Sequence, residues 1–457
     1  MKNRKIIIII GVILAMLCGI IYFVLGKGNT TISSNVSSTI KSELENIDWS
    51  SYDSEEITLS KSVEITKEGV YNLTGTINDG YIYINTDGNV KLVLNNVTIT
   101  NSNGPAIYVV SAKNVEITTV TGTVNTLTDG KEYTNYDEDV NACIYSKDDL
   151  ILSGEGTLKI IANYEDGLAS KDDLEITGGT YIIDAKDDAI RGKDSIEITN
   201  GTFTITSGGD ALKATNTEDS EKGYIVIDNG LFSIDSVGDA IQAETELVIN
   251  AGTFNIKTTG NTNSLSAKGL KANTLIEINN GTFDINTTDD GIHSDGNITI
   301  NNGKFSINSQ DDGIHADGLI EISAGTFDIT AAEGIEATYV KINDGSITIN
   351  ASDDGINAGN KSDKYKVTIE INGGNITIKM GSGDTDGIDS NGNLYINGGT
   401  INITGQSPFD YDGEAKYNGG TIIVNGETVN TITNQMMGGG MMGGMPDGNM
   451  PGRRGMR

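Results

Sequence analysis

Short runs of alternating apolar and polar residues fill this chain from about residue 150 to residue 424. One run is a triplet with isoleucine on both sides of a polar residue, as in Ile276-Glu277-Ile278. A glycine turn follows it, and then a phenylalanine with isoleucine two residues later. Alternation with a period of two over three to five residues predicts short strands with one buried face. Six of the eight phenylalanines occupy that one slot, namely Phe203, Phe232, Phe254, Phe283, Phe305 and Phe327.

A third run places an acidic residue before a small and a branched apolar residue, as in Asp188-Ala189-Ile190. The three runs recur about every 22 residues, with turns too close together for helices. Three short strands per repeat predict an all-β fold, a parallel β-helix in which equivalent positions stack about 4.8 Å apart. A flat antiparallel sandwich is the rival fold, but it gives no reason for one residue type to recur in one slot. We expect an internal phenylalanine column and a corner ladder of Asn250, Asn279, Asn301, Asn343, Asn372, Asn397 and Asn418.

Four insertions interrupt the period, at residues 128–140, 217–222, 260–266 and 359–366. Insertions in a solenoid emerge as loops from one rung, and such loops often carry function. Cys143 lies in an apolar run and is expected to pack inside as a small apolar group.

Four segments are expected along the chain. Residues 1–27 begin with basic residues and continue with twenty apolar or small ones, 6–25, enough for a helix to span a membrane. A cleaved signal peptide is the alternative, but no small-x-small site ends the run. Residues 28–56 are a linker and N-terminal cap, with a short helix over 40–47, and 57–434 form the β-helix. Residues 435–457, rich in glycine and methionine, are expected to be disordered.

These expectations fix an orientation at the membrane. Positive charge at the short leading end places that end in the cytoplasm and the β-helix outside the cell, as a single-pass membrane protein. Trp49, the only tryptophan, is expected to cover the open end of the solenoid, or to act as a stacking platform for a sugar. We expect a monomer.

The chain is 457 residues long, with 63 acidic and 31 basic residues and a formal net charge of −32. Binding a polyanion requires dense lysine and arginine, so nucleic acid is excluded as a partner. Two cysteines are too few for a disulfide framework, and no Cys/His cluster has the spacing of a zinc site.

The acid of the third run recurs in nearly every repeat, and in several repeats a second aspartate precedes it. Stacked carboxylates repel one another, so a raised pKa, a basic neighbour or a cation must offset the repulsion. Ca²⁺ fits best, because it takes six to eight oxygen ligands in flexible geometry. The alternative is a solvated acidic corner in which Asp-Gly simply makes good turns. The predicted calcium ligands are Asp187, Asp188, Asp210, Asp289, Asp290, Asp311, Asp312, Asp353 and Asp354.

Three residues after each acid lies a polar slot that strand parity turns outward. Lysine and arginine there could hold the carboxylates of uronic acids, which suits a polysaccharide ligand. Alternatively, these bases pair with the adjacent acids. A metal-binding or general-base role for the two histidines is a further alternative. The predicted carbohydrate-binding residues are Arg191, Lys213, Gln242, Lys271, His293 and His315.

Over roughly residues 55–434 the chain resembles the carbohydrate-binding β-helix proteins of clostridia and related Gram-positive bacteria. The resemblance implies an extracellular, calcium-containing, right-handed β-helix similar in shape to pectate lyases. It also implies binding of cellulose and of acidic sugars such as polygalacturonate. The segments that carry it are 69–76 (GVYNLTGT), 90–97 (VKLVLNNV), 125–130 (NTLTDG), 142–150 (ACIYSKDDL), 166–174 (DGLASKDDL), 187–194 (DDAIRGKD) and 238–244 (GDAIQAE).

Three functions are therefore open. The leading one is a non-catalytic, calcium-dependent carbohydrate-binding protein at the cell surface, with no catalytic residue assigned. A polysaccharide lyase would need Ca²⁺ on the uronate and a lysine or arginine base, such as Arg191, Lys213 or Lys271. The third is a structural adhesin in which calcium only holds the rungs together.

Overall fold

The computed structural model describes residues 47–260, 266–382 and 385–434. All of them belong to the compact unit Ser42–Arg457. One 3-10 turn, η2 (Trp49–Ser51), precedes the strands, and the ring of Trp49 contacts Tyr52 and lies under the ammonium of Lys91. The described residues otherwise form strands and turns, so the fold is all-β as predicted.

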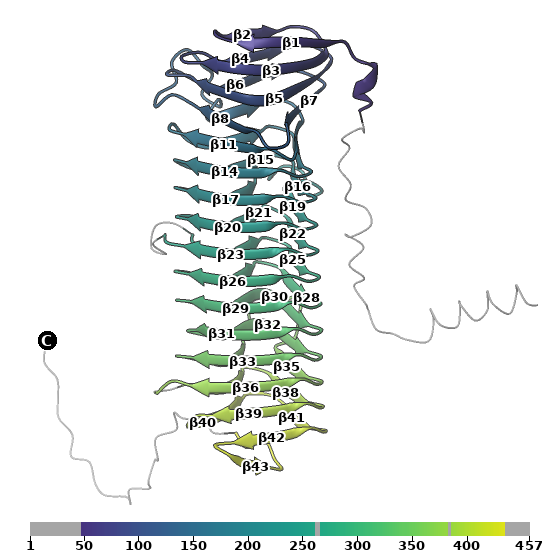
Figure 1. The fold of residues 1–457 in the computed structure, drawn as a ribbon. Coiled ribbons are helices and arrows are strands. Elements are labelled where there is room, and N and C mark those ends of the chain that lie inside the picture. The colour runs from purple at the N-terminus through teal and green to yellow at the C-terminus, as the bar shows by residue number, and fades with distance from the viewer. Residues whose placement is uncertain (1–46, 261–265, 383–384, 435–457) are drawn as a thin grey trace, which may run out of the picture. The chain divides into compact units, whose positions relative to one another are not determined.

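The strands stack in three parallel ladders, and most rungs contribute one strand to each ladder (Figure 1). Ladder I carries the isoleucine triplets. Its strands are β1 (Ser54–Leu59), β3 (Gly69–Ile77), β5 (Asn89–Thr100), β7 (Asn114–Thr119), β10 (Leu150–Gly154), β13 (Asp173–Ile176), β16 (Ser195–Ile198), β19 (Tyr224–Ile227), β22 (Glu246–Ile249), β25 (Leu275–Ile278), β28 (Asn297–Ile300), β30 (Ile314–Ile322), β32 (Ile335–Ile342), β35 (Thr368–Ile371), β38 (Asn393–Ile396) and β41 (Ala415–Tyr417).

Ladder II carries the phenylalanines and begins against the second half of β5. Its strands are β8 (Val124–Thr128), β11 (Thr157–Ala162), β14 (Thr180–Ala185), β17 (Thr202–Ser207), β20 (Leu231–Ser236), β23 (Thr253–Thr258), β26 (Thr282–Thr287), β29 (Lys304–Ser309), β31 (Thr326–Ala331), β33 (Ser346–Ala351), β36 (Asn375–Met380), β39 (Thr400–Thr404), β42 (Thr421–Val424) and β43 (Glu427–Val429). Among the described strands, only the β42–β43 pairing is antiparallel.

Ladder III follows the acidic positions and shares β30 and β32 with ladder I. Its other strands are β2 (Val63–Ile65), β4 (Ile82–Asn85), β6 (Ile107–Ser111), β9 (Ala142–Ser146), β12 (Asp166–Ser170), β15 (Ile190–Gly192), β18 (Leu212–Ala214), β21 (Ile241–Ala243), β24 (Leu270–Ala272), β27 (Ile292–Ser294), β34 (Ile356–Ala358), β37 (Asp386–Ser390) and β40 (Ser407–Tyr411). Strands from successive rungs pairing in parallel are the arrangement of the predicted β-helix.

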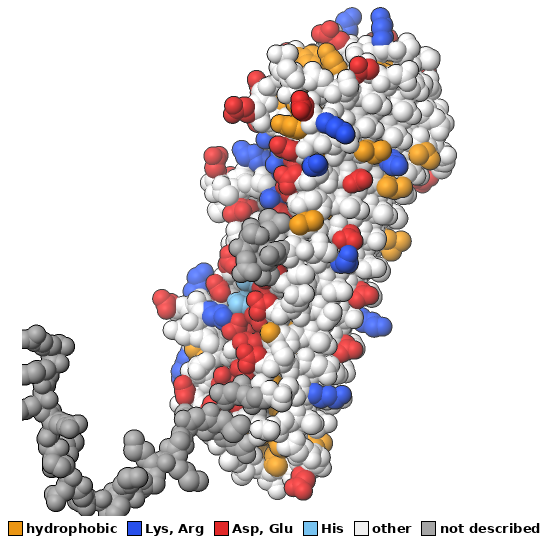
Figure 2. Space-filling model, turned by 90° about the vertical axis from the view of Figure 1, so that its left-hand side faces the viewer, with side chains coloured by type: hydrophobic (Ala, Val, Ile, Leu, Met, Phe, Trp, Pro, Cys, Tyr) orange, Lys and Arg blue, Asp and Glu red, His pale blue; other side chains and the backbone are white. Residues whose placement is uncertain are grey.

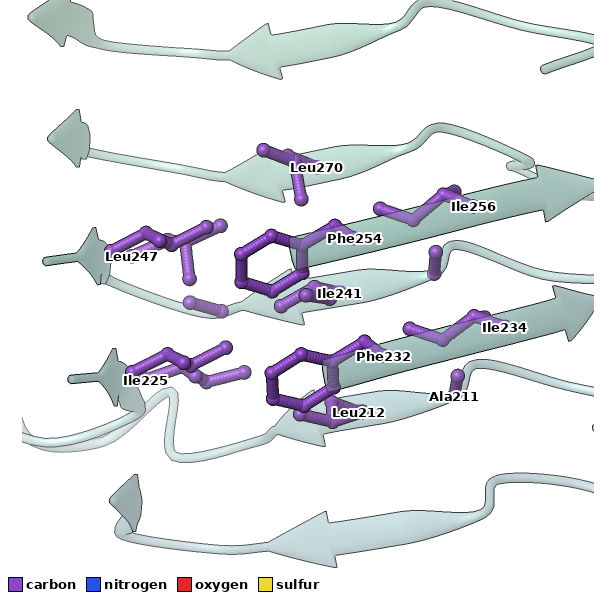
Figure 3. Packing of buried hydrophobic residues seen from close by; sticks show 14 of the residues in the cluster. Ala211, Leu212, Ile225, Phe232, Ile234, Ile241, Leu247, Phe254, Ile256 and Leu270 are labelled. Carbon is purple, nitrogen blue, oxygen red and sulfur yellow. The ribbon is translucent and has the colours of Figure 1, made fainter. Parts of the chain in front are cut away.

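The core lies between the three ladders and contains the predicted phenylalanine column. The rings of Phe232 and Phe254 are stacked with centroids 4.7 Å apart and planes 4° from parallel. In Figure 3 each ring lies among Ile and Leu side chains of all three ladders, and the next rung repeats the arrangement. Cys143 is buried in the same core, as expected.

The glycine of the turn before each phenylalanine is a steric requirement. Gly281 has φ of 144°, a conformation that side-chain-bearing residues rarely adopt. A Cβ on Gly281 would lie only 2.7 Å from the ring of Phe283, which folds back over the turn. The Asn-Gly turn and the buried ring therefore depend on each other.

The predicted asparagine ladder is present at the corner after ladder I. Side-chain amides donate to the oxygen one rung earlier, as Asn279 does to Asn250 at 2.9 Å and Asn301 to Asn279 at 2.7 Å. The ladder is interrupted at Ser323 and resumes at Asn343, whose amide bonds to Glu321. These side-chain bonds satisfy polar groups along the corner that would otherwise depend on solvent.

Several sequence expectations fall outside the described residues. These are the membrane anchor within 1–27, nearly all of the helix expected over 40–47, and the tail 435–457. Within the described ranges, no helix has the length and apolar character needed to cross a membrane. The predicted insertions at 217–222 and 359–366 are loops between strands, and that at 128–140 is a loop from residue 129 onward. Residues 261–265 of the predicted insertion at 260–266 lie outside the described residues.

Candidate functional site

Ladder III presents one residue per rung at the same register, flanked by two residues that point into the core. We call this set the outer file. It contains all six residues predicted to bind carbohydrate. It begins with Glu64 on β2, and from β4 onward it consists of Tyr83, Tyr108, Tyr145, Ala169, Arg191, Lys213, Gln242, Lys271, His293, His315, Glu336, Asn357, Asp389 and Asp410. From β4 onward its chemistry thus changes along the axis from aromatic to basic and then to acidic.

The acids three residues before the outer file form a second column, which we call the acid column. It consists of Asp166, Asp188, Asp210, Asp239, Asp290, Asp312, Glu333, Asp354 and Asp386, with Lys268 between Asp239 and Asp290. Figure 2 shows acidic side chains in a band along this face, with basic side chains and histidine among them. Asp166, Asp188 and Asp239 are each no more than 3% exposed, so part of this column is buried rather than solvated.

One carboxylate oxygen of these aspartates accepts a backbone hydrogen bond from the next rung. Oδ1 of Asp166 accepts from the N–H of Asp188 at 3.1 Å, and Oδ1 of Asp188 accepts from Asp210 at 2.8 Å. The series continues to Asp239 and Lys268, and it recurs between Asp290 and Asp312 at 3.0 Å. These carboxylates therefore replace a main-chain acceptor where the chain turns into ladder III.

The other oxygen pairs with the outer file. Oδ2 of Asp166 lies 2.8 Å from Arg191, and Lys213 lies 2.8 Å from Asp210 and 3.4 Å from Asp188. Lys271 is 3.4 Å from Asp239. The bases are thus engaged with adjacent acids, the alternative left open by the sequence. Lys213 still has 30% of its side chain exposed, and Arg191 has 21%, so both can reach a ligand on this face.

Gln242 continues the same pattern between two lysine rungs. With its amide nitrogen turned toward the acid column, it donates to Oδ2 of Asp210 at 2.9 Å and of Asp239 at 3.3 Å. A neutral donor here keeps the hydrogen-bond pattern without adding a further charge.

The two histidines are stacked one rung apart, with ring centroids 4.8 Å from each other. Nδ1 of His293 lies 2.7 Å from Asp290, and Nδ1 of His315 lies 2.7 Å from Asp312 and 3.1 Å from Glu336. Burial lowers the pKa of His315, but Asp312 and Glu336 outweigh it and raise that pKa to about 10. Asp312, His315 and Glu336 have ligand atoms within 4.8 Å of one another, as do Asp290, His293 and His315, so metal binding by the two histidines stays a prediction.

Burial also acts on the acids. It raises the pKa of Asp166 to about 7 and that of Asp210 to about 6, although Arg191 and Lys213 oppose the rise. Desolvation disfavours a charged carboxylate, and the paired bases offset only part of that effect. Asp290 differs, because His293 and Lys268 outweigh burial and hold its pKa below the usual range.

The predicted calcium ligands do not form one cluster. Asp289, Asp290 and Asp311 have oxygens within 4.8 Å of one another, so these three predicted ligands lie close enough together to hold one ion. The ammonium of Lys268 lies 2.7 Å from Asp289 and 3.0 Å from Asp290, so a base already balances these acids. Asp187 and Asp353 are exposed, as Asp311 is.

Acidic side chains also collect at the C-terminal end of the outer file, at Asp389 and Asp410. Burial first, and then the neighbouring acids Asp354, Asp386 and Asp410, raise the pKa of Asp389 to about 7. Among the described residues, Oδ1 of Asp410 and Oδ1 of Asn357 are buried and have no hydrogen-bond partner. Because Asn357, Asp389 and Asp410 occupy successive rungs, this end offers three oxygen-bearing side chains in register. Such hard oxygen donors suit Ca²⁺.

The aromatic stretch of the outer file escaped the sequence analysis. Tyr83, Tyr108 and Tyr145 are aligned on β4, β6 and β9, and Tyr108 and Tyr136 line a cavity of about 580 Å³. The signal was available in the sequence, because a tyrosine stands between apolar residues in Ile82-Tyr83-Ile84 and again around Tyr108.

Comparison with known proteins shows the family to which the chain belongs. A family model described as carbohydrate-binding domain-containing protein matches residues 60–313 and 307–437. These matches cover most of the chain, which therefore belongs to this carbohydrate-binding domain family.

Two individual proteins are similar to the chain. A carbohydrate-binding domain-containing protein of Acetivibrio thermocellus is 51% identical over 169 residues, which cover 36% of this chain and 59% of that protein. The match thus spans less than two thirds of the relative's length. A solved structure of the polysaccharide lyase-like protein from C. thermocellum, a gadolinium derivative, is 34% identical, covers 51% of this chain and 91% of the other, and superimposes with a TM-score of 0.45.

Proposed function

We propose that this protein is a non-catalytic, calcium-dependent carbohydrate-binding protein that holds acidic or neutral cell-wall polysaccharide outside the cell. The observation that carries the proposal is the register of the outer file in a chain of a carbohydrate-binding family. A row of side chains with one residue per rung matches an extended ligand with repeating units. Polygalacturonate and cellulose are the two polysaccharides that the sequence resemblance implies.

The basic stretch of the outer file, Arg191 to Lys271, supports binding of an acidic glycan. Arg191 and Lys213 lie on adjacent rungs, and Lys271 lies two rungs beyond Lys213. A uronate carboxylate can share these cations with the acid column through charge-assisted hydrogen bonds. On a chain with a net charge of −32, this stretch places three basic side chains on one face, where they can contact an anionic polymer.

A binding role suits these bases better than catalysis. A lyase needs a lysine or arginine that can accept the proton α to the carboxyl group. Burial lowers the pKa of Lys213, but Asp210 and Asp188 outweigh it and raise the pKa above its usual value. A lysine held in its protonated form serves as a cation for the ligand and not as a base.

Calcium is proposed at the C-terminal end of the outer file. Asn357, Asp389 and Asp410, together with Asp354 of the predicted set, would supply oxygens from successive rungs. A divalent cation would offset their repulsion and give the buried oxygen of Asp410 a partner. When bound, the ion would join neighbouring rungs and could bridge a uronate of the ligand.

The anchored, extracellular location is proposed from the sequence of residues 1–27 alone, with basic residues before the apolar run. Fractionation of cells that produce the full-length chain tests it, together with mass spectrometry of the mature N-terminus. Recovery in the membrane fraction with residues 1–27 intact is expected. A soluble product that begins after residue 27 would contradict the anchor.

Affinity electrophoresis in gels containing polygalacturonate, with Ca²⁺ or with EGTA, tests the binding role. Retardation by the polymer with Ca²⁺ is expected, and Lys213→Met should weaken it at least threefold. The matched control is Lys159→Met, an exposed lysine on ladder II. Absorbance of unsaturated product measures lyase activity in parallel, and steady product formation that Lys213→Met abolishes would overturn the non-catalytic assignment.

A further inference from the structure

A cleft of about 580 Å³ lies at the N-terminal end of ladder III, beside the loop that joins β8 to β9. Four partly exposed tyrosines line it, Tyr81, Tyr83, Tyr108 and Tyr136, together with polar groups such as Asn103 and Asp79. Its volume is in the range of small-molecule sites, about 300–1,000 Å³. Its lining combines four tyrosines with eight polar side chains, so the cleft offers both aromatic surface and hydrogen-bonding groups.

The tyrosine rings are set at steep angles to one another. Tyr83 and Tyr108 have centroids 5.7 Å apart with planes at 73°, and Tyr108 and Tyr136 have centroids 5.6 Å apart with planes at 65°. These edge-to-face contacts hold the rings in fixed positions relative to one another, and all three tyrosines line the cleft. A sugar ring needs both aromatic surface and polar groups, because its C–H face packs on an aromatic ring while its hydroxyls need polar partners.

The loop that carries Tyr136 is held in place before any ligand binds. The N–H of Thr134 donates to Asn103 at 2.9 Å, and the N–H of Gly130 donates to the carbonyl of Gly104 at 3.2 Å. Gly104 has φ of 145°, and a Cβ there would lie 2.4 Å from the hydroxyl oxygen of Tyr136. The cleft is therefore preorganised, which lowers the entropy that binding must overcome.

The charges of the lining select an uncharged ligand. Asp79 and Asp137 line the cleft, and no lysine or arginine is among its lining residues. The ammonium of Lys147 lies 3.3 Å from Asp137 and pairs with it, although Lys147 does not line the cleft. A uronate would therefore meet the carboxylate of Asp79, whereas the hydroxyl groups of a neutral sugar can donate to both acids. The basic stretch is separated from the cleft, since Tyr145 and Ala169 lie between them in the outer file and are fully buried.

We propose that this tyrosine cleft binds an uncharged pyranose of a neutral polysaccharide, as a site distinct from the basic stretch around Lys213. The inference rests on the proposed carbohydrate-binding function and assigns the neutral and acidic ligands to different parts of one face. Tyr83 and Tyr136 pack against the sugar ring, Asp79 accepts a hydrogen bond from one of its hydroxyls, and the side-chain NH2 of Asn103 donates to another.

Calorimetric titration of the full-length chain with a β-1,4-linked glucose hexamer and with a galacturonate hexamer tests the proposal. Tyr83→Ala and Tyr136→Ala should each lower the affinity for the glucose hexamer at least tenfold and leave the galacturonate affinity within twofold. Tyr136→Phe keeps the ring and should stay within threefold of the wild type. The matched control is Tyr365→Ala, a partly exposed tyrosine in the loop between β34 and β35.

A second measurement does not depend on the folding of any variant. If the two sites are distinct, saturating galacturonate hexamer leaves the affinity of wild-type protein for the glucose hexamer within twofold. Competition between the two ligands would overturn the proposal, as would tyrosine variants that keep full affinity for the glucose hexamer. Binding of galacturonate alone would overturn it while leaving the proposed function intact, and binding of neither polysaccharide would overturn both.

Discussion

The main-chain N–H of Asp210 donates a 2.8 Å hydrogen bond to Oδ1 of Asp188, which lies one rung earlier. The same carboxylate reaches Lys213 with its other oxygen, at 3.4 Å. One buried aspartate thus satisfies a backbone donor and neutralises an outer-file cation. The acid column is therefore part of the framework of the solenoid as well as part of its electrostatics.

Removing this acceptor should destabilise the fold. In Asp188→Ala the N–H of Asp210 loses its partner in a buried position, and we expect the free energy of unfolding to fall by about 2 kcal/mol. Urea unfolding measures the change. Asp188→Asn keeps an acceptor oxygen and should lose less. The matched control is Asp328→Ala, an exposed aspartate on β31, which should stay within about 0.5 kcal/mol of wild type. Equal stability of the two alanine variants would contradict the structural role.

Among substitutions in the core, those in the phenylalanine column should lower the free energy of unfolding most. Phe283 is stacked between Phe254 and Phe305, with centroids 4.8 Å away on both sides. Phe283→Ala leaves a cavity in a repetitive core and should lower the free energy of unfolding by about 3–5 kcal/mol. Phe283→Leu fills more of the space and should lose less than half as much. A loss below about 1 kcal/mol for the alanine variant would argue against a tightly packed column.

Lys268 should determine whether the middle of the acid column needs a metal. In Lys268→Met, the carboxylates of Asp289, Asp290 and Asp311 lose the ammonium that lies between them. Removing one partner of a buried ion pair is strongly destabilising, so we expect a loss of about 3 kcal/mol in EGTA.

Millimolar Ca²⁺ should restore part of the stability of Lys268→Met, because the three acids then offer oxygen ligands to the ion. Thermal melting with and without Ca²⁺ measures the recovery, and Lys304→Met, an exposed lysine on β29, is the control. Unchanged melting of Lys268→Met in EGTA would show that Lys268 does not balance this cluster.

The acidic end of the outer file should make stability depend on pH. Burial first, and neighbouring acids next, raise the pKa of Asp389 to about 7, and burial is also the main cause that raises the pKa of Glu333 to about 8. A carboxyl group whose pKa is raised by folding binds more protons in the folded state than in the unfolded state. Without calcium, stability should therefore fall as pH rises from about 4 to 8.

Calcium binding at this end should reverse that trend, since the ion stabilises the ionised acids. The gain in melting temperature from Ca²⁺ should be larger at pH 8 than at pH 5, by mass action on the folded state. Asp389→Asn should reduce both the pH dependence and the calcium effect. Identical melting in Ca²⁺ and EGTA at pH 8 would remove calcium from the proposed function.

His315 should contribute stability of the opposite pH dependence. Its folded-state pKa of about 10 lies above the unfolded value of about 6.5, so its contribution is complete below pH 6.5 and is lost as pH rises to 10. His315→Asn should therefore be less stable than wild type at pH 6, and the difference should shrink by pH 10. Urea unfolding at each pH measures this difference. A difference that stays constant from pH 6 to pH 10 would contradict a protonated His315.

Much of the fold could be predicted from the sequence because the same side-chain types recur at the same positions of each repeat. Phenylalanine in one slot and asparagine in another identified the ladders, since only stacked rungs place like residues together. The prediction extended to the acid column and to the six residues from Arg191 to His315. Their alignment follows from the same period.

The partners of those residues were not predictable. Whether Lys213 faces a ligand or Asp210 depends on distances of a few ångströms, which rotamers and the turn geometry set. The role of Lys268 also required coordinates, because Asp289 belongs to the following rung. Tyr83 and Tyr108 were missed because the insertion at 128–140 lengthens the rung that follows and hides the period.

The sequence by itself determined the period, the strands and which side chains share a face, because alternation and stacking are properties of order along the chain. Only the tertiary structure decided which charges neutralise one another and where an aromatic cleft forms. Those outcomes depend on contacts between rungs and with an inserted loop. The spacing of residues along the sequence does not give the distances across these contacts.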